Sequence, residues 1–415
     1  MKWIRPSKIK GRIPAPPSKS DMIRATAAAS LAAGVSKIIR PSLCDDTLAG
    51  LGVAAALGAR VAFRGRTVEI QGGGRPVKKV LDCGESGLCL RLFAPIAALG
   101  KQEMILSGHG TLLARPVGMA EIPLTRLGVV CESDGGFPPL RVKGPLRGGR
   151  VELDGSVSSQ LLSGLLMALP VCERDSKIEI KNLVSRPYVD LTVAVLSRFG
   201  VSVSWDKTRD TIEIAGRQRY EPQRFEVEGD WSGASFLLVA AALAGRIAVE
   251  NLSAESCQAD VRILDALRAA GARVSLQDRV VLVETDELKA FEFDAADCPD
   301  LFPPLAALAL FCDGWSEIRG VERLRHKESD RAAALAGEFA RIGGRMEIEG
   351  NVMKIGGGAL RGGGVDPRGD HRMAMAGAVA GLRAANGVRI EHPQVVSKSY
   401  PRFFEDLASV GGDIT

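Results

Sequence analysis

Six times along this 415-residue chain, an apolar segment of helical character ends at a glycine and is followed directly by a strand-like segment. A near-constant period of this length indicates that one supersecondary unit is repeated. Positions that correspond in the six copies are therefore expected to converge in space. The glycines are 70, 72, 71, 72 and 68 residues apart and are Gly58, Gly128, Gly200, Gly271, Gly343 and Gly411.

Each copy follows the same order of segments. A helix rich in Ala and Leu comes first, and an alternating strand such as residues 177–181 follows it. The second helix ends at the repeated glycine, the residue expected for a left-handed C-terminal cap. Two further strands complete the copy, as in residues 273–275 and Val280–Glu284. The sixth copy stops after one of them, so we expect Lys2–Arg5 to supply the missing strand and both termini to share a domain.

The domain organisation follows from the length and the number of copies. A chain of 415 residues is too long for one compact core, and six copies divide into two lobes of three. We place the crossings between lobes near residues 14–17 and 228–229. The predicted domains are residues 1–16 with 229–415, and residues 17–228. The two connections would act as a hinge beside a cleft, whereas a continuous single domain is the competing interpretation.

Composition argues against several classes of protein. The net charge is only +5, aromatic residues make up 5%, and no Lys/Arg run is present, which argues against a nucleic-acid surface. The apolar runs are too short to span a bilayer. We expect a cytoplasmic protein with reduced cysteines and no metal or cofactor. The eight cysteines lack metal-site spacing, and the four histidines are scattered as His109, His326, His371 and His392.

Short segments rich in Gly, Ser and Asp precede the first helix of each copy. Helix N-termini carry unpaired N–H groups and partial positive charge, so six of them at equivalent places would attract anions. Ordinary N-terminal caps are the alternative explanation for any one segment taken alone. The segments are residues 17–20, 84–87, 158–160, 229–232, 299–300 and 369–372.

Basic residues cluster at or near these helix starts and in nearby loops. Each one alone would be interpreted as a solvated surface side chain. Together they indicate a ligand that carries several phosphate and carboxylate groups, which Arg binds bidentately and Lys binds as a point charge. They are Lys19, Arg24, Arg91, Arg115, Lys327, Arg331, Arg372 and Lys398.

Seven segments, in order along nearly the whole chain, resemble the 5-enolpyruvylshikimate-3-phosphate synthase family. The resemblance implies an α/β fold, a two-lobed inverse α/β barrel of six βαβαββ units, three per lobe. It also implies a monomer that needs no cofactor. The segments are residues 17–20 with Arg24, 158–160, 185–190, 228–230, 327–331, 370–375 and 398–401.

The family's reaction transfers the enolpyruvyl group of phosphoenolpyruvate to the 5-hydroxyl of shikimate 3-phosphate and releases phosphate. The pathway is the shikimate route to chorismate and the aromatic amino acids. By resemblance, the residues that would bind shikimate 3-phosphate are Lys19, Ser20, Arg24, Ser158, Ser159, Gln160, Ser185, Tyr188, Asp300 and Lys327. Those that would bind phosphoenolpyruvate are Lys19, Gly87, Arg115, Gln160, Arg331, Arg372 and Lys398.

Three residues resemble the family's proton-transferring groups. Asp300 would take the proton from the 5-hydroxyl, Glu328 would protonate the methylene carbon of phosphoenolpyruvate, and Lys19 could share either role. The spacing alone favours another interpretation of Glu328, as an i,i+3 partner of Arg331 on a surface helix. Because the phosphoenolpyruvate ligands are divided between the predicted lobes, we expect an open form that closes on ligand binding.

Four positions depart from the common pattern of the family. Glu85 replaces an amide beside an anion site, where an unpaired carboxylate would weaken phosphoenolpyruvate binding. Leu88 and Leu92 replace the usual Thr and Pro, which leaves the response to the inhibitor glyphosate open. Arg323 stands where an Asn commonly contacts shikimate 3-phosphate, so that contact is unassigned.

Three alternatives remain at this point. A UDP-N-acetylglucosamine enolpyruvyl transferase would share the fold and the donor, but its members carry Lys-Asn at the first helix start and lack the pattern of residues 370–373. A nonenzymatic anion-binding scaffold would release no phosphate. A relative of RNA-terminal phosphate cyclases would need a nucleotide-dependent His, which none of the scattered histidines convincingly supplies.

Overall fold

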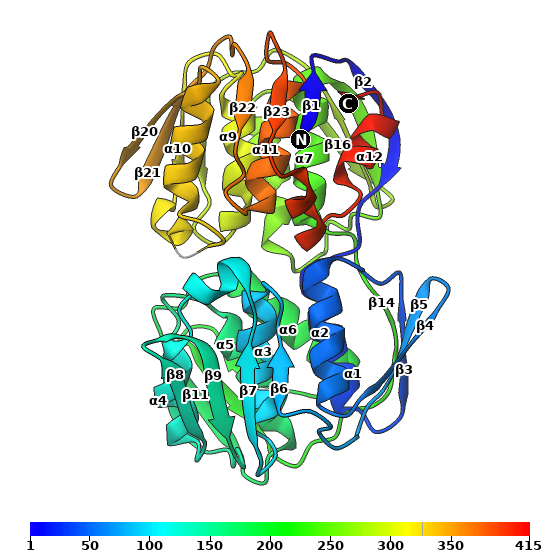
Figure 1. The fold of residues 1–415 in the computed structure, drawn as a ribbon, viewed down its shortest axis with the longest axis vertical. Coiled ribbons are helices and arrows are strands. Elements are labelled where there is room, and N and C mark those ends of the chain that lie inside the picture. The colour runs from blue at the N-terminus through cyan, green and yellow to red at the C-terminus, as the bar shows by residue number, and fades with distance from the viewer. Residues whose placement is uncertain (326) are drawn as a thin grey trace. The chain divides into compact units, whose positions relative to one another are not determined.

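The chain divides into two compact units in a computed structural model that describes residues 1–325 and 327–415. One unit comprises residues 1–18 and 228–415, and the other comprises residues 19–227. The sequence placed these boundaries at 16/17 and 228/229. Both termini lie in the same unit, as expected from the incomplete sixth copy. Figure 1 shows the chain coloured from the N-terminus to the C-terminus.

Four-stranded sheets and helices alternate through both units. In residues 19–227 the elements are α1 (Lys19–Leu31), β3 (Val35–Ile39), α2 (Asp45–Ala56), β4 (Arg60–Arg64), β5 (Thr67–Gln71), β6 (Val80–Asp82), α3 (Gly87–Ala97), β7 (Glu103–Ser107), η1 (Gly110–Ala114), η2 (Gly118–Ala120), α4 (Glu121–Arg126), β8 (Val130–Asp134), β9 (Phe137–Lys143), β10 (Arg150–Asp154), α5 (Gln160–Ala168), η3 (Leu169–Val171), β11 (Ser176–Lys181), α6 (Arg186–Arg198), β12 (Ser204–Asp206), β13 (Thr211–Ile214) and β14 (Arg224–Glu226).

The unit that holds the termini has the same alternation. Its elements are β1 (Lys2–Arg5), β2 (Ile9–Pro14), α7 (Trp231–Ala244), β15 (Gly245–Glu250), η4 (Ala259–Arg262), α8 (Ile263–Ala269), β16 (Arg273–Gln277), β17 (Val280–Glu284), β18 (Glu292–Asp294), η5 (Pro299–Leu301), α9 (Phe302–Ala309), β19 (Trp315–Arg319), η6 (Val321–Leu324), α10 (Arg331–Arg341), β20 (Arg345–Glu349), β21 (Val352–Gly356), β22 (Gly363–Val365), α11 (His371–Gly381), β23 (Val388–Ile390), η7 (Pro393–Lys398), α12 (Phe403–Ser409) and β24 (Asp413–Ile414).

The repeated glycines end the second helices in the predicted conformation. All six have positive φ, from 78° at Gly200 to 108° at Gly411, a region that residues with a Cβ rarely adopt. The predicted pairing of the N-terminal strand is also confirmed. Strand β1 lies between β23 and β24 and is antiparallel to both, which Figure 1 shows as the blue strand beside the red one.

Two copies exchange their first strands. Four sheets are each built as one copy predicts, with orders such as β6-β7-β9-β8 and β18-β19-β21-β20. In the first copy, however, β3 pairs in parallel with β14 instead of β2, and in the fourth copy β15 pairs in parallel with β2. The reason is that each crossing lies between a first strand and the helix that follows it. The strand therefore remains in one unit while its helix enters the other.

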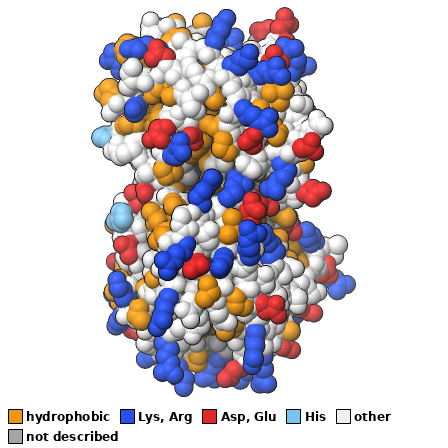
Figure 2. All heavy atoms as spheres, turned by 90° about the vertical axis from the view of Figure 1, so that its right-hand side faces the viewer, with side chains coloured by type: hydrophobic (Ala, Val, Ile, Leu, Met, Phe, Trp, Pro, Cys, Tyr) orange, Lys and Arg blue, Asp and Glu red, His pale blue; other side chains and the backbone are white. Residues whose placement is uncertain are grey.

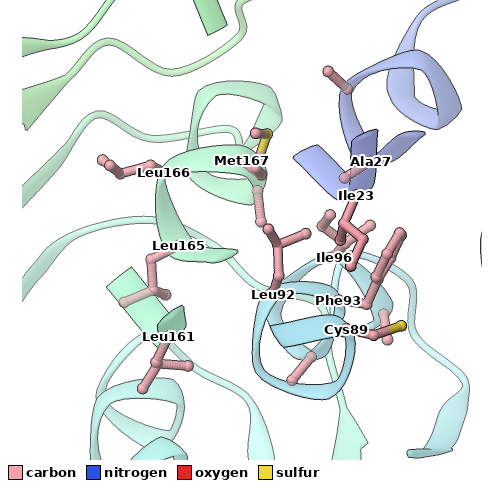
Figure 3. Packing of buried hydrophobic residues seen from close by; sticks show 14 of the residues in the cluster. Ile23, Ala27, Cys89, Leu92, Phe93, Ile96, Leu161, Leu165, Leu166 and Met167 are labelled. Carbon is pink, nitrogen blue, oxygen red and sulfur yellow. The ribbon is translucent and has the colours of Figure 1, made fainter. Parts of the chain in front are cut away.

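The first helices of the copies form the core of each unit. Helix α7 is buried along residues 231–243, and an all-round apolar helix is typical of a core position. Helices α7, α9 and α11 contact one another in the terminal unit. In the other unit α3 contacts α1 and α5, and Figure 3 shows Ile23, Leu92 and Leu165 from these helices in one apolar cluster.

Charged side chains of both signs lie on the face of the molecule drawn in Figure 2, and none of the described helices could cross a membrane. On the face drawn in Figure 2, Lys and Arg side chains are interspersed with Asp and Glu. Among residues 1–325 and 327–415, no helix has the length and apolar character needed to cross a bilayer.

Candidate active site

Side-chain caps occupy three of the six helix starts that the sequence singled out. Ser86 accepts from the Cys89 amide at 3.3 Å, Asp230 from Gly233 at 3.0 Å, and Asp370 from Arg372 at 2.9 Å. The simpler interpretation as N-terminal caps is therefore correct for α3, α7 and α11. Each cap fixes the backbone of its helix start and hence the direction of the polar side chains around it.

Three carboxylates surround Arg331, the first residue of α10. This side chain is 0% exposed and donates to three carboxylates. Nη1 lies 3.0 Å from Asp300, Nη2 lies 2.7 Å from Glu328, and Nε lies 2.8 Å from Asp370. Burial by itself would lower the pKa of Arg331, but these three carboxylates raise it above its ordinary value. Arg331 therefore stays charged and orders the starts of α9, α10 and α11.

Asp300 is contacted by three cations. Its Oδ1 accepts from Lys327 at 3.2 Å and from Arg331 at 3.0 Å, and its Oδ2 accepts from Arg372 at 3.1 Å. Burial would raise the pKa of Asp300, yet Arg372, Lys327 and Arg331 together hold it well below the ordinary value. The Asp300 carboxylate is thus ionised at neutral pH, and in that form it can accept a proton.

Glu328 and Lys327 precede α10 rather than lying on it. The i,i+3 pair between Glu328 and Arg331 exists, as spacing predicted, but Arg331 is fully buried and the Glu328 side chain is only 9% exposed. The surface-helix interpretation is therefore wrong. Burial lowers the pKa of Lys327, and Asp300 opposes that effect. A buried ammonium with a lowered pKa loses its proton more readily than a solvated one.

Lys398, a predicted phosphoenolpyruvate ligand, and Arg323, a departure from the family pattern, lie in short helices of the terminal unit. Lys398 ends η7 and is 5% exposed. Arg323 lies in η6, where burial lowers its pKa while Asp297 and Asp300 oppose that shift. Arg323, which departs from the family pattern, is therefore close enough to the Asp300 carboxylate to interact with it electrostatically.

In the other unit, Arg24 joins three helices. It projects from α1 and donates to the Ser20 carbonyl at 3.0 Å, the Tyr188 carbonyl at 3.2 Å and the Thr192 hydroxyl at 2.8 Å. It also donates to Ser163 on α5 at 3.3 Å. Burial lowers its pKa to about 10, which still leaves it charged at neutral pH. The predicted ligands Ser20, Arg24 and Tyr188 are therefore brought together.

A second group forms around Arg91 on α3. Its Nη1 donates to Gln160 at 2.6 Å, and its Nε and Nη2 donate to the Pro116 carbonyl at 3.3 and 2.7 Å. A Cβ placed on Gly87 would lie 2.7 Å from Arg115 Cζ and 3.0 Å from Arg91 Nη1. Gly87 thus allows two guanidinium groups to lie against the start of α3. Three predicted phosphoenolpyruvate ligands, Gly87, Arg115 and Gln160, meet here.

The remaining predicted ligands have separate local environments. Lys19 begins α1, and its Nζ lies 2.8 Å from Asp46 at the start of α2. Ser158 accepts from the Gln160 amide at 3.2 Å, and Ser159 precedes α5 without a side-chain cap bond. Ser185 precedes α6 with φ of 57°, a conformation uncommon for a residue with a side chain.

Three of the departures from the family pattern have a structural role in this unit. Leu88 and Leu92 are buried, and a Cβ on Gly164 would lie 2.6 Å from the Leu92 carbonyl oxygen. Helices α3 and α5 therefore approach closely at Leu92, as Figure 3 shows. Glu85 accepts from the Thr111 amide at 2.9 Å and from the Thr111 hydroxyl at 2.6 Å. Its carboxylate is paired, which removes the main reason to expect weakened anion binding.

Three acidic residues that contact or electrostatically influence the predicted ligands were not predicted as site residues. Asp370 had a visible signal, because it directly precedes a helix start and stands two residues before Arg372. Asp46 and Asp260 had none, since they approach Lys19 and Asp300 only through the fold. Burial and the negative charge of Asp300 raise the pKa of Asp260 to about 7, whereas Arg372 lowers it.

Each unit therefore carries buried cations whose positions are fixed by helix starts. Such groups bind phosphate and carboxylate oxygens, and an ionised carboxylate among them can accept a proton. Within residues 1–325 and 327–415, no group of three or more His, Cys, Asp and Glu side chains is placed to hold a metal ion. His326, one of the scattered histidines, lies outside the described residues.

Comparison with known proteins gives a consistent result. A family model described as EPSP synthase (3-phosphoshikimate 1-carboxyvinyltransferase) matches residues 4–407. A 3-phosphoshikimate 1-carboxyvinyltransferase of Aeropyrum pernix is 41% identical, with 99% of this chain and 96% of that protein covered. One of Methanopyrus kandleri is 40% identical, with 97% and 96% covered.

Solved structures agree on the fold. A structure of EPSP synthase from Acinetobacter baumannii superposes with a TM-score of 0.85 at 24% identity, covering 100% of this chain and 99% of that chain. A second structure of EPSP synthase from the same organism gives 0.82 at 23% identity, with 100% and 99% covered. The predicted fold class is thereby confirmed.

Proposed function

This chain belongs to the EPSP synthase family, and from that premise we propose that it catalyses the transfer of the enolpyruvyl group from phosphoenolpyruvate to the 5-hydroxyl of shikimate 3-phosphate. The chain is a 3-phosphoshikimate 1-carboxyvinyltransferase of the shikimate pathway, which leads to aromatic amino acids. The products are 5-enolpyruvylshikimate 3-phosphate and inorganic phosphate.

One observation supports this chemistry above the others. Asp300 is an ionised, largely buried carboxylate in contact with Lys327, Arg331 and Arg372. A general base must be unprotonated before the reaction, and an anionic substrate needs buried cations. Both requirements meet at this one residue.

We assign the substrate contacts from the family motifs and the local geometry. Shikimate 3-phosphate would bind to Lys19, Ser20, Arg24, Ser158, Ser159, Gln160, Ser185, Tyr188, Asp300 and Lys327. Phosphoenolpyruvate would bind to Lys19, Gly87, Arg115, Gln160, Arg331, Arg372 and Lys398. The second set is divided between the two units, so neither unit by itself would carry every contact.

The reaction divides into addition and elimination. In the addition, Glu328 in its protonated form gives a proton to the methylene carbon of phosphoenolpyruvate, Asp300 takes the proton of the 5-hydroxyl, and a bond forms between that oxygen and C2. In the elimination, the bond between C2 and the phosphate oxygen breaks and the phosphate takes the proton held by Asp300. The methyl group returns a proton to Glu328, which restores the double bond. Lys19 would share one of the proton transfers. Fixed cations stabilise the departing phosphate.

Substrate binding would also change the basicity of Asp300. Without substrate, three cations hold its pKa well below the ordinary value, which makes it a weak base. Arg331 and Arg372 are both assigned to phosphoenolpyruvate, and a guanidinium that turns toward a substrate oxygen stabilises the Asp300 carboxylate less. We therefore propose that phosphoenolpyruvate raises the pKa of Asp300 toward a value suited to proton transfer.

The setting of the reaction follows from the family. We propose a cytoplasmic enzyme that acts as a monomer and uses neither a metal ion nor an organic cofactor. Its partners are the two small substrates, and nucleic acid is not among them.

The direct test is phosphate release from the two substrates, measured for the wild type and for Lys19→Ala and Asp300→Asn. We expect each variant to lose roughly 10²–10⁴-fold in kcat. For Asp300→Asn the KM for phosphoenolpyruvate should not rise, because removing the carboxylate leaves the three cations in place. A matched control is Lys37→Ala, which removes an exposed lysine that lies 3.6 Å from Glu69.

Two results would overturn the proposal. A wild type that releases no phosphate is not this enzyme, and release that depends on UDP-N-acetylglucosamine would identify the related transferase instead. Full activity in Lys19→Ala or Asp300→Asn would remove that residue from the mechanism.

A further inference from the structure

Glu85 lies where the segments before and after it form a ladder of hydrogen bonds. The Cys83 amide donates to the Ser107 carbonyl at 2.7 Å, and the His109 amide donates to the Gly84 carbonyl at 3.0 Å. The Thr111 amide comes next in this ladder and donates to the Glu85 carboxylate at 2.9 Å. The Glu85 side chain thus provides the next acceptor in this ladder, because the backbone itself turns into α3.

The Thr111 side chain strengthens this link. Its hydroxyl lies 2.6 Å from the same carboxylate oxygen, so Glu85 accepts two hydrogen bonds from one residue. Gly110 makes room for the carboxylate, because a Cβ at that position would lie 2.5 Å from Glu85 Cδ. Gly110 also has φ of 56°, which favours glycine. The glycine at the start of η1 therefore leaves the space that the Glu85 side chain occupies.

The segment that Glu85 holds leads directly to Arg115. Helix η1 spans only Gly110–Ala114, and the Arg115 amide donates to the Leu112 carbonyl at 3.0 Å. On the far side of Arg115, the Pro116 carbonyl accepts from Arg91 on α3. The loop that carries Arg115 is thus tied on both sides to residues at the start of α3, by Glu85 before it and by Arg91 after it.

We propose that Glu85 is a positioning residue that fixes Arg115 for phosphoenolpyruvate, acting through Thr111 and η1. The inference rests on the proposed function, because it concerns a contact of that substrate. The Glu85 carboxylate accepts hydrogen bonds from the amide and the hydroxyl of Thr111 and so holds the segment that leads to Arg115. On this proposal its effect on phosphoenolpyruvate binding is favourable, through the placement of Arg115.

The test compares Glu85→Ala and Glu85→Gln by steady-state kinetics. We expect Glu85→Ala to raise the KM for phosphoenolpyruvate about tenfold or more, with kcat and the KM for shikimate 3-phosphate within about twofold. Glu85→Gln keeps an oxygen acceptor for the Thr111 amide and should restore the KM to within about threefold of wild type. Simple repulsion between Glu85 and the substrate predicts the opposite, a lower KM in both variants.

A matched control exists in the same unit. Asp206 accepts from the Thr208 amide at 3.0 Å and from the Thr208 hydroxyl at 2.6 Å, which is nearly the same pair of bonds in an exposed turn. Asp206→Ala should leave all kinetic constants unchanged. If Asp206→Ala raised the KM for phosphoenolpyruvate as much as Glu85→Ala, the loss of two such hydrogen bonds would act by destabilising the unit in general. That result would overturn the proposal.

A second variant and a second readout keep the inference testable if Glu85→Ala does not fold. Thr111→Val removes the hydroxyl bond only, and we expect an intermediate rise in the KM, about threefold. Amide hydrogen exchange at Thr111 should be faster in Glu85→Gln than in wild type, because a neutral amide oxygen is a weaker acceptor than a carboxylate. Unchanged exchange, or an unchanged or lowered KM in the Glu85 and Thr111 variants, would overturn the proposal. Wild-type turnover tests the proposed function separately, and the exchange measurement needs no turnover.

Discussion

At the scale of single residues, two buried carboxylates in the terminal unit have opposite environments. Three cations lower the pKa of Asp300, whereas burial and the charge of Asp300 raise the pKa of Asp260 to about 7. Opposite pKa shifts in two similar side chains are typical of functional sites, because neighbouring charges can keep one group ionised and the other protonated. Asp300 is ionised at neutral pH, and Asp260 holds its proton more tightly than a solvated carboxylate.

The raised pKa of Asp260 predicts a pH-dependent stability. Between about pH 4 and pH 7 the unfolded chain ionises at this residue while the folded protein retains the proton, so the free energy of unfolding falls as the pH rises, and it levels above pH 7. Asp260→Asn removes this slope. The variant's stability relative to wild type should therefore increase between pH 5 and pH 8 by roughly 2–4 kcal/mol.

Urea unfolding at several pH values measures this effect. The groups that influence Asp260 are Asp300, Arg372, Ser232 and Asp230. Asp265→Asn, which removes an exposed carboxylate from the adjacent helix α8, should give a curve parallel to wild type. Parallel curves for Asp260→Asn as well would contradict the raised pKa.

At the scale of secondary structure, α10 fixes the start of α11 at two points. At its first residue, Arg331 pairs with Asp370, the cap of α11. Two turns later, Glu338 is 1% exposed and accepts from Arg368 at 2.8 Å and from the Asp366 amide at 3.1 Å. Because Arg372 belongs to the first turn of α11, a single helix orients two cations of the candidate site.

We expect Glu338→Ala to lower the free energy of unfolding by roughly 1–3 kcal/mol. The loss leaves the Asp366 amide without its described acceptor, while Arg368, about half exposed, regains water. Urea unfolding gives the magnitude, and Glu347→Ala, at an exposed position of β20, is the control. Equal stabilities for the two variants would show that Glu338 does not secure this helix start.

At the scale of the whole molecule, the chain passes twice between units at adjacent points. Pro17 and Gly229 form a bridge there, and the Ser18 amide donates to the Glu228 carbonyl at 2.8 Å. These crossings explain why β2 and β14 are exchanged between copies. They also divide the apolar cores, so each unit buries its own first helices.

The burial of the cysteines predicts how their thiols react. Among the described residues no disulfide links any of the eight cysteines; seven of them are buried, and Cys257 is partly exposed. We expect at most one thiol to react rapidly with a disulfide reagent in the native protein and all eight after denaturation. Cys257→Ser should abolish the rapid reaction. Rapid modification of several thiols would contradict the buried positions.

Features that depend on neighbours along the chain could be predicted from the order of the amino acids. The repeated glycines predicted helix ends, because a left-handed cap is a property of one residue and its adjacent turn. The polar helix starts and their basic residues were likewise visible, as was the need for Lys2–Arg5 to complete a sheet. The family motifs then identified the reaction class.

Contacts between groups far apart in the chain depend on how the folded protein packs. The sequence located the crossings after β2 and β14, but the strands with which these two pair are set by packing in the fold. The pairing of Glu85 with Thr111, and of Asp46 with Lys19, depends on helix starts that pack together although they are 26 and 27 residues apart. The pKa of Asp300 is set in the same way, because Coulomb interactions depend on distance in space rather than on separation in the chain.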